Sequence, residues 1–153
     1  MNYPNRISAI NSLIEINNDR IEGYMTAATE TDEDDLKIMF QQLSETSKKF
    51  NTELIFEINK LNGTPIEGTS TIGKFFRAWM EMKTAITQQD RKSILESCAY
   101  GEEIAMETYN IALSRDLIDI PLEIQDIVHR QKGILKSESD KINLMVKQLE
   151  GVD

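Results

Sequence analysis

The stretch LKIMFQQLSETSKKFNTELIFEINKLNG, residues 36–63, decides the fold. Apolar side chains recur along it every three or four positions, a pattern typical of a long helix that packs against other helices. The seam consists of Leu36, Phe40, Leu43, Phe50, Leu54, Ile58 and Leu61, with the polar Ser47 in its middle. Asn62-Gly63, followed by Pro65, is a typical helix end. The stretch therefore predicts a helix of roughly 30 residues, about 45 Å long.

Helical spacing continues on both sides of this segment. Apolar residues at steps of three and four run from Ile10 to Ala28, from Leu95 to Ala112 and from Val128 to Leu149. A shorter helix with several aromatic residues is predicted from about Ile72 to Ile86. Strand signals are weak throughout, so the chain is predicted to be all-α.

Two junctions carry signals for helix starts. Thr31 and Asp34 have the spacing of a capping box, which predicts that the second helix begins there. Asp119 is expected to cap the fourth long helix, with Pro121 in its first turn, where a proline is tolerated.

The connection between the helices follows from their lengths. The first and second long helices are expected to form one hairpin, and the third and fourth another. The loop after residue 63 and the short helix together are long enough to return the chain along the bundle. Residues 1–153 are therefore predicted to form one domain, a ferritin-like antiparallel four-helix bundle with a short crossover helix between the second and third long helices. A five-helix up-and-down array is the alternative.

Glycines inside three of the predicted long helices, Gly23, Gly101 and Gly133, bear on packing. Each costs about 1 kcal/mol relative to alanine in a helix interior. Close approach of neighbouring side chains would offset this cost, and for Gly133 an exposed, incidental glycine is an equal expectation.

Composition excludes several classes of partner. The formal net charge of -9 and the pI of about 4.7 disfavour binding to nucleic acid or to an anionic membrane surface. No apolar stretch approaches the roughly 18 residues of a membrane span, and the first residues do not have the pattern of a signal peptide. The single cysteine, Cys98, falls on an apolar helical stripe and is expected to be a buried, reduced thiol, as in a cytoplasmic protein.

Several short elements, in their order and spacing, resemble a known family. They are Ile21-Glu22-Gly23-Tyr24 with Ala27-Ala28, Phe50 with Glu53-Leu54, Leu61-Asn62-Gly63 with Pro65, Gly73 with Arg77-Ala78-Trp79, Gly101-Glu102-Glu103 with Ala105, Tyr109 and Ala112-Leu113, and Gln131. Together they resemble the bacterial family filed as domain of unknown function 2383, which is grouped with ferritin-like bundles. The resemblance covers about residues 7–149 and implies no known activity. Many members carry histidines where this chain has Phe76 and Ser139.

The resemblance to ferritin-like bundles raises the question of metal. Di-iron bundles take a Glu from each of two helices and a Glu-x-x-His pair from each of the other two. This chain has one histidine, His129, and the nearest pattern is Asp126-Ile127-Val128-His129. Because His129 lies one residue off the predicted seam, we expect it at the surface rather than at a metal.

Carboxylates on the seams are the remaining candidates for a site. Glu102 and Glu138 fall on the seams of the third and fourth long helices, Gln131 lies one heptad before Glu138, and Glu53 flanks the second seam. A buried carboxylate needs a partner. The expected arrangement is a polar layer that fixes the register of the helices, with Arg77, Lys48, Gln131 or tyrosine hydroxyls as partners. A metal ion is the alternative partner.

The sequence contains no Cys/His or Ser/His arrangement, no phosphate-binding glycine loop and no dinucleotide motif. We therefore predict no catalytic or cofactor-binding residues and an uncharacterised, non-enzymatic association or structural protein. It would act as a homo-oligomer or with a protein partner, and the aromatic helix around Trp79 would offer the surface. The alternative is a carboxylate-rich, degenerate di-iron bundle with lost or altered oxidase or storage chemistry.

Overall fold

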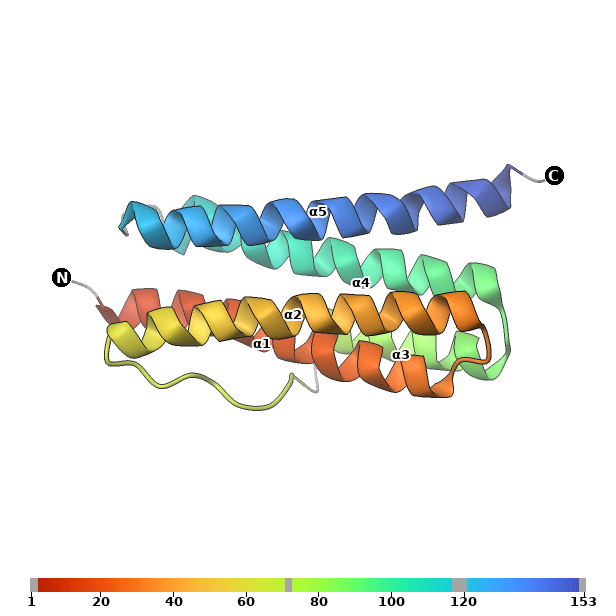
Figure 1. Ribbon diagram of the computed structural model, residues 1–153, viewed down its shortest axis with the longest axis horizontal. Coiled ribbons are helices and arrows are strands. Elements are labelled where there is room, and N and C mark those ends of the chain that lie inside the picture. The colour runs from red at the N-terminus through yellow and green to blue at the C-terminus, as the bar shows by residue number, and fades with distance from the viewer. Residues whose placement is uncertain (1–2, 71–72, 117–120, 152–153) are drawn as a thin grey trace.

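The computed structural model describes residues 3–70, 73–116 and 121–151. Within these ranges the chain forms an all-α bundle of four long helices and one short helix, as predicted (Figure 1). The elements are α1 (Tyr3–Glu30), α2 (Asp34–Lys60), α3 (Lys74–Thr87), α4 (Arg91–Ile111), the π-helical turn η1 (Ala112–Asp116) and α5 (Leu122–Glu150). Among the helices of the described ranges, none is both long and apolar enough to cross a bilayer.

The connection between the two hairpins sets the order of the helices. α1 and α2 form one antiparallel hairpin, and α4 and α5 form the other (Figure 1). The loop after α2 and then α3 carry the chain back along the bundle, so α4 runs parallel to α2 (Figure 1). The predicted crossover is therefore present. α3 forms the last part of this crossover and packs against α1 and α4.

Side chains of α1 hold the crossover loop in place. Four hydrogen bonds of 2.8–3.0 Å link successive positions of α1 to the backbone of the loop. They join Asn11 to Thr64 and Ile66, Asn18 to Gly68, and Asp19 to Ser70. Because the bonds advance in step along both segments, the loop follows the axis of α1.

The helix ends agree with the sequence in part. Asn62 adopts φ 59°, and the N–H of Gly63 bonds to the carbonyl of Ile58 at 3.0 Å, which confirms the predicted end of α2. The prediction of a capping box that starts at Thr31 is wrong. Glu33 is the N-cap of α2, and the Thr31 hydroxyl accepts the N–H of Glu33 at 3.2 Å instead.

The N-cap of α5 lies two positions after the predicted one. Pro121 is the N-cap residue of α5 rather than a member of its first turn, and the expected cap Asp119 lies outside the described residues. At the start of α4, by contrast, the carboxylate of Asp90 accepts the N–H of Ser93 at 3.2 Å, which is ordinary side-chain capping.

The core is divided into two apolar clusters along the bundle. One contains Ile10, Leu13, Phe50, Leu54, Ile104 and Leu135, and the other contains Ala27, Phe40, Leu43, Met82, Leu95 and Ile142. On α1, α2 and α4, buried polar residues lie between the members of the two clusters in sequence, and on α5 the part-buried Glu138 lies between them. A polar layer therefore crosses the middle of the bundle.

One of the mid-helix glycines permits close packing. A Cβ on Gly101 would meet Phe75 at 3.2 Å, whereas one on Gly23 would meet the ring of Trp79 at 3.6 Å, an ordinary contact distance. A Cβ on Gly133 would meet nothing within 4 Å, so this glycine is an incidental, exposed one.

Gly133 and Gly101 predict different responses to alanine. Gly133→Ala should raise the free energy of unfolding by about 0.5–1 kcal/mol, because it removes backbone entropy from the unfolded chain without a clash. Gly101→Ala should give no such gain, because the new methyl group presses on the buried ring of Phe75. Urea unfolding of the two variants and the parent measures both effects, and an equal gain at both positions would contradict this packing.

Asp19 predicts a pH dependence of stability. Burial, with the nearby charges of Glu15 and Glu22, raises the pKa of Asp19 from 3.8 to about 7, although the hydrogen bond from the N–H of Ser70 opposes the shift. The folded protein therefore keeps a proton on Asp19 that the unfolded chain has lost, so this group lowers stability as the pH rises from about 4 through 7.

Asp19→Asn should remove this contribution. The free energy of unfolding of the variant minus that of the parent should increase between pH 4 and pH 7 and then level off, because asparagine carries no charge to bury. Urea unfolding at a series of pH values gives this difference directly, and a difference that stays constant across the range would refute the raised pKa.

Candidate functional site

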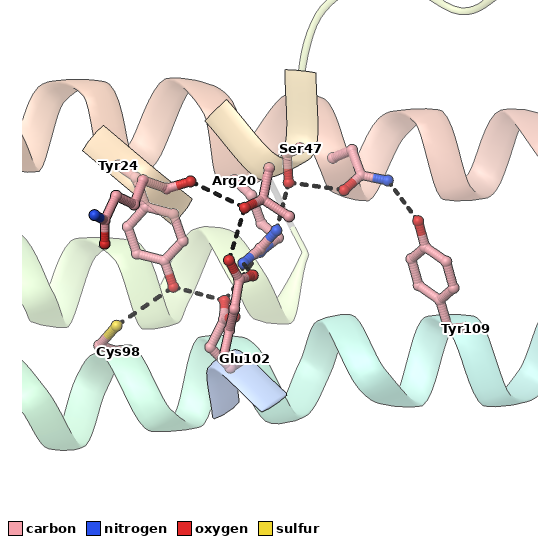
Figure 2. Close-up of polar contacts among 10 residues, drawn as sticks. Arg20, Tyr24, Ser47, Cys98, Glu102 and Tyr109 are labelled. Atoms are coloured by element: carbon pink, nitrogen blue, oxygen red, sulfur yellow. Dashed lines mark hydrogen bonds and ion pairs between the residues drawn. The ribbon is translucent and has the colours of Figure 1, made fainter. Parts of the chain in front are cut away.

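The centre of the polar layer is the guanidinium group of Arg20 on α1. Arg20 is fully buried, and its Nε and Nη2 donate to the two carboxylate oxygens of Glu102 on α4 at 3.0 and 2.7 Å. Nη2 also lies 3.1 Å from a carboxylate oxygen of Glu138 on α5. Figure 2 shows Arg20 directed at Glu102 across the core. One cation thus binds two carboxylates from two other helices.

The charge on Arg20 is stabilised by these neighbours. Burial opposes the charged form, but the attraction of Glu102, the neighbouring Tyr24 and Glu138 outweighs it and raises the pKa of Arg20. The two-point contact with Glu102 is the strong, planar geometry that arginine forms with carboxylates. Arg20 therefore remains a cation inside the protein.

A tyrosine and the cysteine extend the site toward one end of the bundle. The hydroxyl of Tyr24 donates to Glu102 at 2.7 Å and lies 3.4 Å from the sulfur of Cys98 (Figure 2). Burial raises the pKa of the Cys98 thiol and of the Tyr24 hydroxyl, so both stay protonated at neutral pH. A buried neutral thiol is a poor nucleophile, and Cys98 serves as a packing residue.

A chain of hydrogen bonds leads from Arg20 toward the other end. Arg20 donates to the hydroxyl of Ser47 on α2, and Ser47 donates to Oδ1 of Asn17 at 2.8 Å. Nδ2 of Asn17 donates to the hydroxyl of Tyr109 (Figure 2). The hydroxyl of Tyr109 in turn donates to Oε1 of Gln131 at 2.7 Å. Burial raises the pKa of Tyr109 as well, so its hydroxyl keeps the proton that it donates.

The site reaches the surface at two places. Gln131 donates to Glu53 at 3.2 Å, and Glu53 also binds Arg130. Burial opposes ionisation of Glu53, but the hydrogen bonds from Arg130 and Gln131 outweigh it and lower its pKa. Glu138 accepts the hydroxyl of Thr46 at 2.7 Å, and burial raises its pKa.

The structure thus brings all four predicted polar residues into one network. Glu102 and Glu138 both bind the central Arg20 directly. Gln131 lies at the far end of the hydrogen-bond chain through Ser47, Asn17 and Tyr109, and the half-buried Glu53 lies beyond it at the edge. Two of the proposed partners are absent from it, since Arg77 and Lys48 are exposed. The tyrosine hydroxyls do take part, as proposed.

Arg20 and Asn17 are the residues that sequence reasoning missed. They occupy the seam of α1 at regular steps, in the series Leu13, Asn17, Arg20 and Tyr24. The series was visible in the sequence, but only its apolar members were used to trace the first helix. The available signal was an arginine on the apolar seam of one helix, since such a residue needs a carboxylate partner and Glu102 lies on the seam of another.

The arrangement does not fit a di-iron centre. The carboxylates of Glu102 and Glu138 converge on the guanidinium of Arg20, so a cation already stands between them. Over the described ranges, no three His, Cys, Asp or Glu side chains are grouped to hold a metal ion. His129 is exposed on α5, away from the seam, as expected.

Removing Arg20 tests the energetic role of the site. Arg20→Met should lower the free energy of unfolding by about 3–5 kcal/mol, because Glu102 would be left as an uncompensated buried charge. The matched control is Arg91→Met, which removes an arginine paired with Glu33 and Asp35 at the surface and should cost about 1 kcal/mol or less.

A second variant separates lost charge compensation from lost volume. Arg20→Met combined with Glu102→Leu should recover most of the stability, since the fully buried charge is gone and the part-buried Glu138 still accepts the hydroxyl of Thr46. Urea unfolding measures all four proteins. An Arg20→Met variant no less stable than Arg91→Met would show that the buried ion pair does not contribute to the free energy of unfolding.

Comparison with known proteins places the chain in a family. No curated protein matches it. The family model described as "Domain of unknown function (DUF2383)" matches residues 5–115, a span that holds Arg20, Ser47, Glu102 and Tyr109 but ends before α5. Because the match covers most of the chain, the protein belongs to the family of domain of unknown function 2383.

Proposed function

We propose that this protein is a non-enzymatic association protein, a ferritin-like bundle whose core serves structure and whose surface serves binding. The observation that carries the proposal is Arg20, which compensates the charge of Glu102 and Glu138 from within the chain. The groups that would perform acid–base or metal chemistry in the core are thereby bonded to one another. The one crossover supports the ferritin-like description, since that connectivity occurs in such folds.

A groove between α4 and α5 offers a binding surface on the outside of the bundle. It has a volume of about 580 Å³, and its floor includes Ala99, Met106 and Val146. Tyr100 stands beside this floor with 46% of its surface exposed. An exposed aromatic side chain next to an apolar strip is typical of the centre of a binding interface.

The charges around the groove favour a basic partner. Glu96, Glu103 and Glu150 line it, against the single positive charge of Lys147. Two copies of a chain with a net charge of -9 repel each other, which disfavours self-association on this face. The partner that fits is a basic amphipathic helix, with apolar residues against the floor and lysines or arginines toward the glutamates.

This proposal moves the interaction surface away from Trp79. The indole of Trp79 packs over Gly23 and against the apolar core, so the short helix is engaged within the bundle. The buried, protonated thiol of Cys98 is consistent with action in the cytoplasm.

Binding of a model partner tests the groove. A helical peptide with leucines on one face and lysines on the other should bind the protein, whereas the same peptide with glutamates should not. Tyr100→Ala should weaken binding by about tenfold or more, in the range of interface hot spots. Ile38→Ala is the matched control, because Ile38 is an exposed apolar residue on α2 outside the groove.

Titration calorimetry at two salt concentrations measures these affinities. Because Tyr100→Ala leaves the net charge unchanged, equal binding by both variants would mean that the peptide is held by charge alone, and the groove would be excluded. Sedimentation of the free protein should give a monomer. A dimer broken by Tyr100→Ala would assign the groove to self-association and overturn the basic partner.

The degenerate metal bundle is the competing proposal and has its own measurement. Elemental analysis of protein purified without chelator should find far less than one equivalent of iron, manganese or zinc, and added metal should leave the melting temperature unchanged. Stoichiometric metal, or a clear rise of the melting temperature, would favour the metalloprotein instead.

A further inference from the structure

A second hollow lies where the crossover loop and α3 meet α1. We call this hollow the loop pocket. Its volume is about 110 Å³, and its lining includes Asp19 and Glu22 from α1, Thr69 from the loop, and Phe76 and Trp79 from α3. It shares no residue with the groove between α4 and α5. Its size matches a small group rather than a folded partner.

One carboxylate in the loop pocket, that of Asp19, accepts a hydrogen bond through only one of its two oxygens. Asp19 is 8% exposed, and its Oδ1 accepts the N–H of Ser70 at 2.8 Å. Among the residues that the structure describes, none donates to its Oδ2. Oδ2 is accessible, so it can accept hydrogen bonds from a ligand with N–H groups.

The charges around Asp19 select a cation. Glu22 lines the same hollow and Glu15 lies near on α1, and both make the potential at Asp19 more negative. Lys74 on α3 lines a neighbouring hollow that Asp19 also borders, and at the surface its Nζ lies 3.8 Å from Glu107. The lining of the loop pocket itself contains no basic side chain.

The aromatic walls select an organic cation over a hydrated metal ion. Trp79 and Phe76 line the pocket together with the carboxylates, and the indole packs against Gly23. Phe75, the third aromatic residue of the lining, is held edge-on against Tyr24. Aromatic faces attract alkylammonium groups, and such walls provide no oxygen ligands for a metal.

We propose that the loop pocket binds an alkylammonium group, with its N–H bonds directed to Asp19 and its methylene carbons against Trp79 and Phe76. The chemistry is shared by a free alkylamine and by a lysine side chain of a peptide. The site is independent of the proposed groove on α4 and α5.

The single tryptophan makes binding directly measurable. Trp79 is the only tryptophan in the chain, so its fluorescence reports on the loop pocket. Butylammonium chloride should change this fluorescence in a saturable manner at pH 8, where Asp19 is ionised. 1-Butanol, which has the same chain without the charge, and potassium chloride at the same ionic strength should not.

Variants assign the effect to the pocket. Asp19→Asn should weaken butylammonium binding by about tenfold or more, the loss expected when a charged hydrogen bond is removed. Glu22→Gln, which does not touch the crossover loop through a hydrogen bond, should weaken it by a smaller factor. Asp140→Asn on α5 is the matched control, since it makes the same change at an exposed ion pair with Lys136 and should bind as the parent does.

The proposal is overturned if 1-butanol acts as strongly as butylammonium, or if Asp19→Asn and Glu22→Gln both bind like the control. Circular dichroism verifies that the variants are folded, and Glu22→Gln keeps the test valid if Asp19→Asn disturbs the loop. Nα-acetyl-lysine amide identifies the source: tighter binding than butylammonium indicates a lysine of a partner, and weaker binding indicates a free amine.

Discussion

The ion pair between Arg20 and Glu102 is the constraint on which the rest of the bundle depends. Neither charge is tolerable alone in an apolar core, because the effective cost of burying one ion is several kcal/mol. Each is compensated by the other through two hydrogen bonds, and Tyr24 satisfies a further lone pair of Glu102. The geometry requires α1 and α4 to face each other at these levels, which fixes how far one helix is shifted along the other.

The remaining polar contacts extend that constraint to the other two long helices. Ser47 ties α2 to Arg20, and Glu138 ties α5 to the same guanidinium. Apolar seams alone pack nearly as well when a helix slides by a heptad, whereas a buried polar contact is lost on sliding. The polar layer between the two apolar clusters therefore specifies a single register, while the clusters contribute most of the buried apolar area.

Much of this was accessible from the sequence, and the part that was not has a physical reason. The seam of residues 36–63, the helix end at Asn62 and the crossover depend on local periodicity and length, so they could be predicted. Glu102, Gln131 and Glu138 were visible as polar residues on apolar seams. Arg20, the partner of both glutamates, was not identified, because Arg20 and Glu102 are 82 positions apart and only the packed bundle brings them together. The error at Thr31 was smaller, since a capping pattern fits several adjacent positions equally well.

The same separation has a consequence for how the chain acquires its structure during synthesis. The hairpin of α1 and α2 is complete in sequence long before Glu102 is made, and its contacts are local enough to form early. At that stage Arg20 lies on the inner face of the hairpin without Glu102 or Glu138 to pair with. The inner face of the first hairpin therefore lacks both its carboxylate partners and its apolar cover until α4 and α5 have been made.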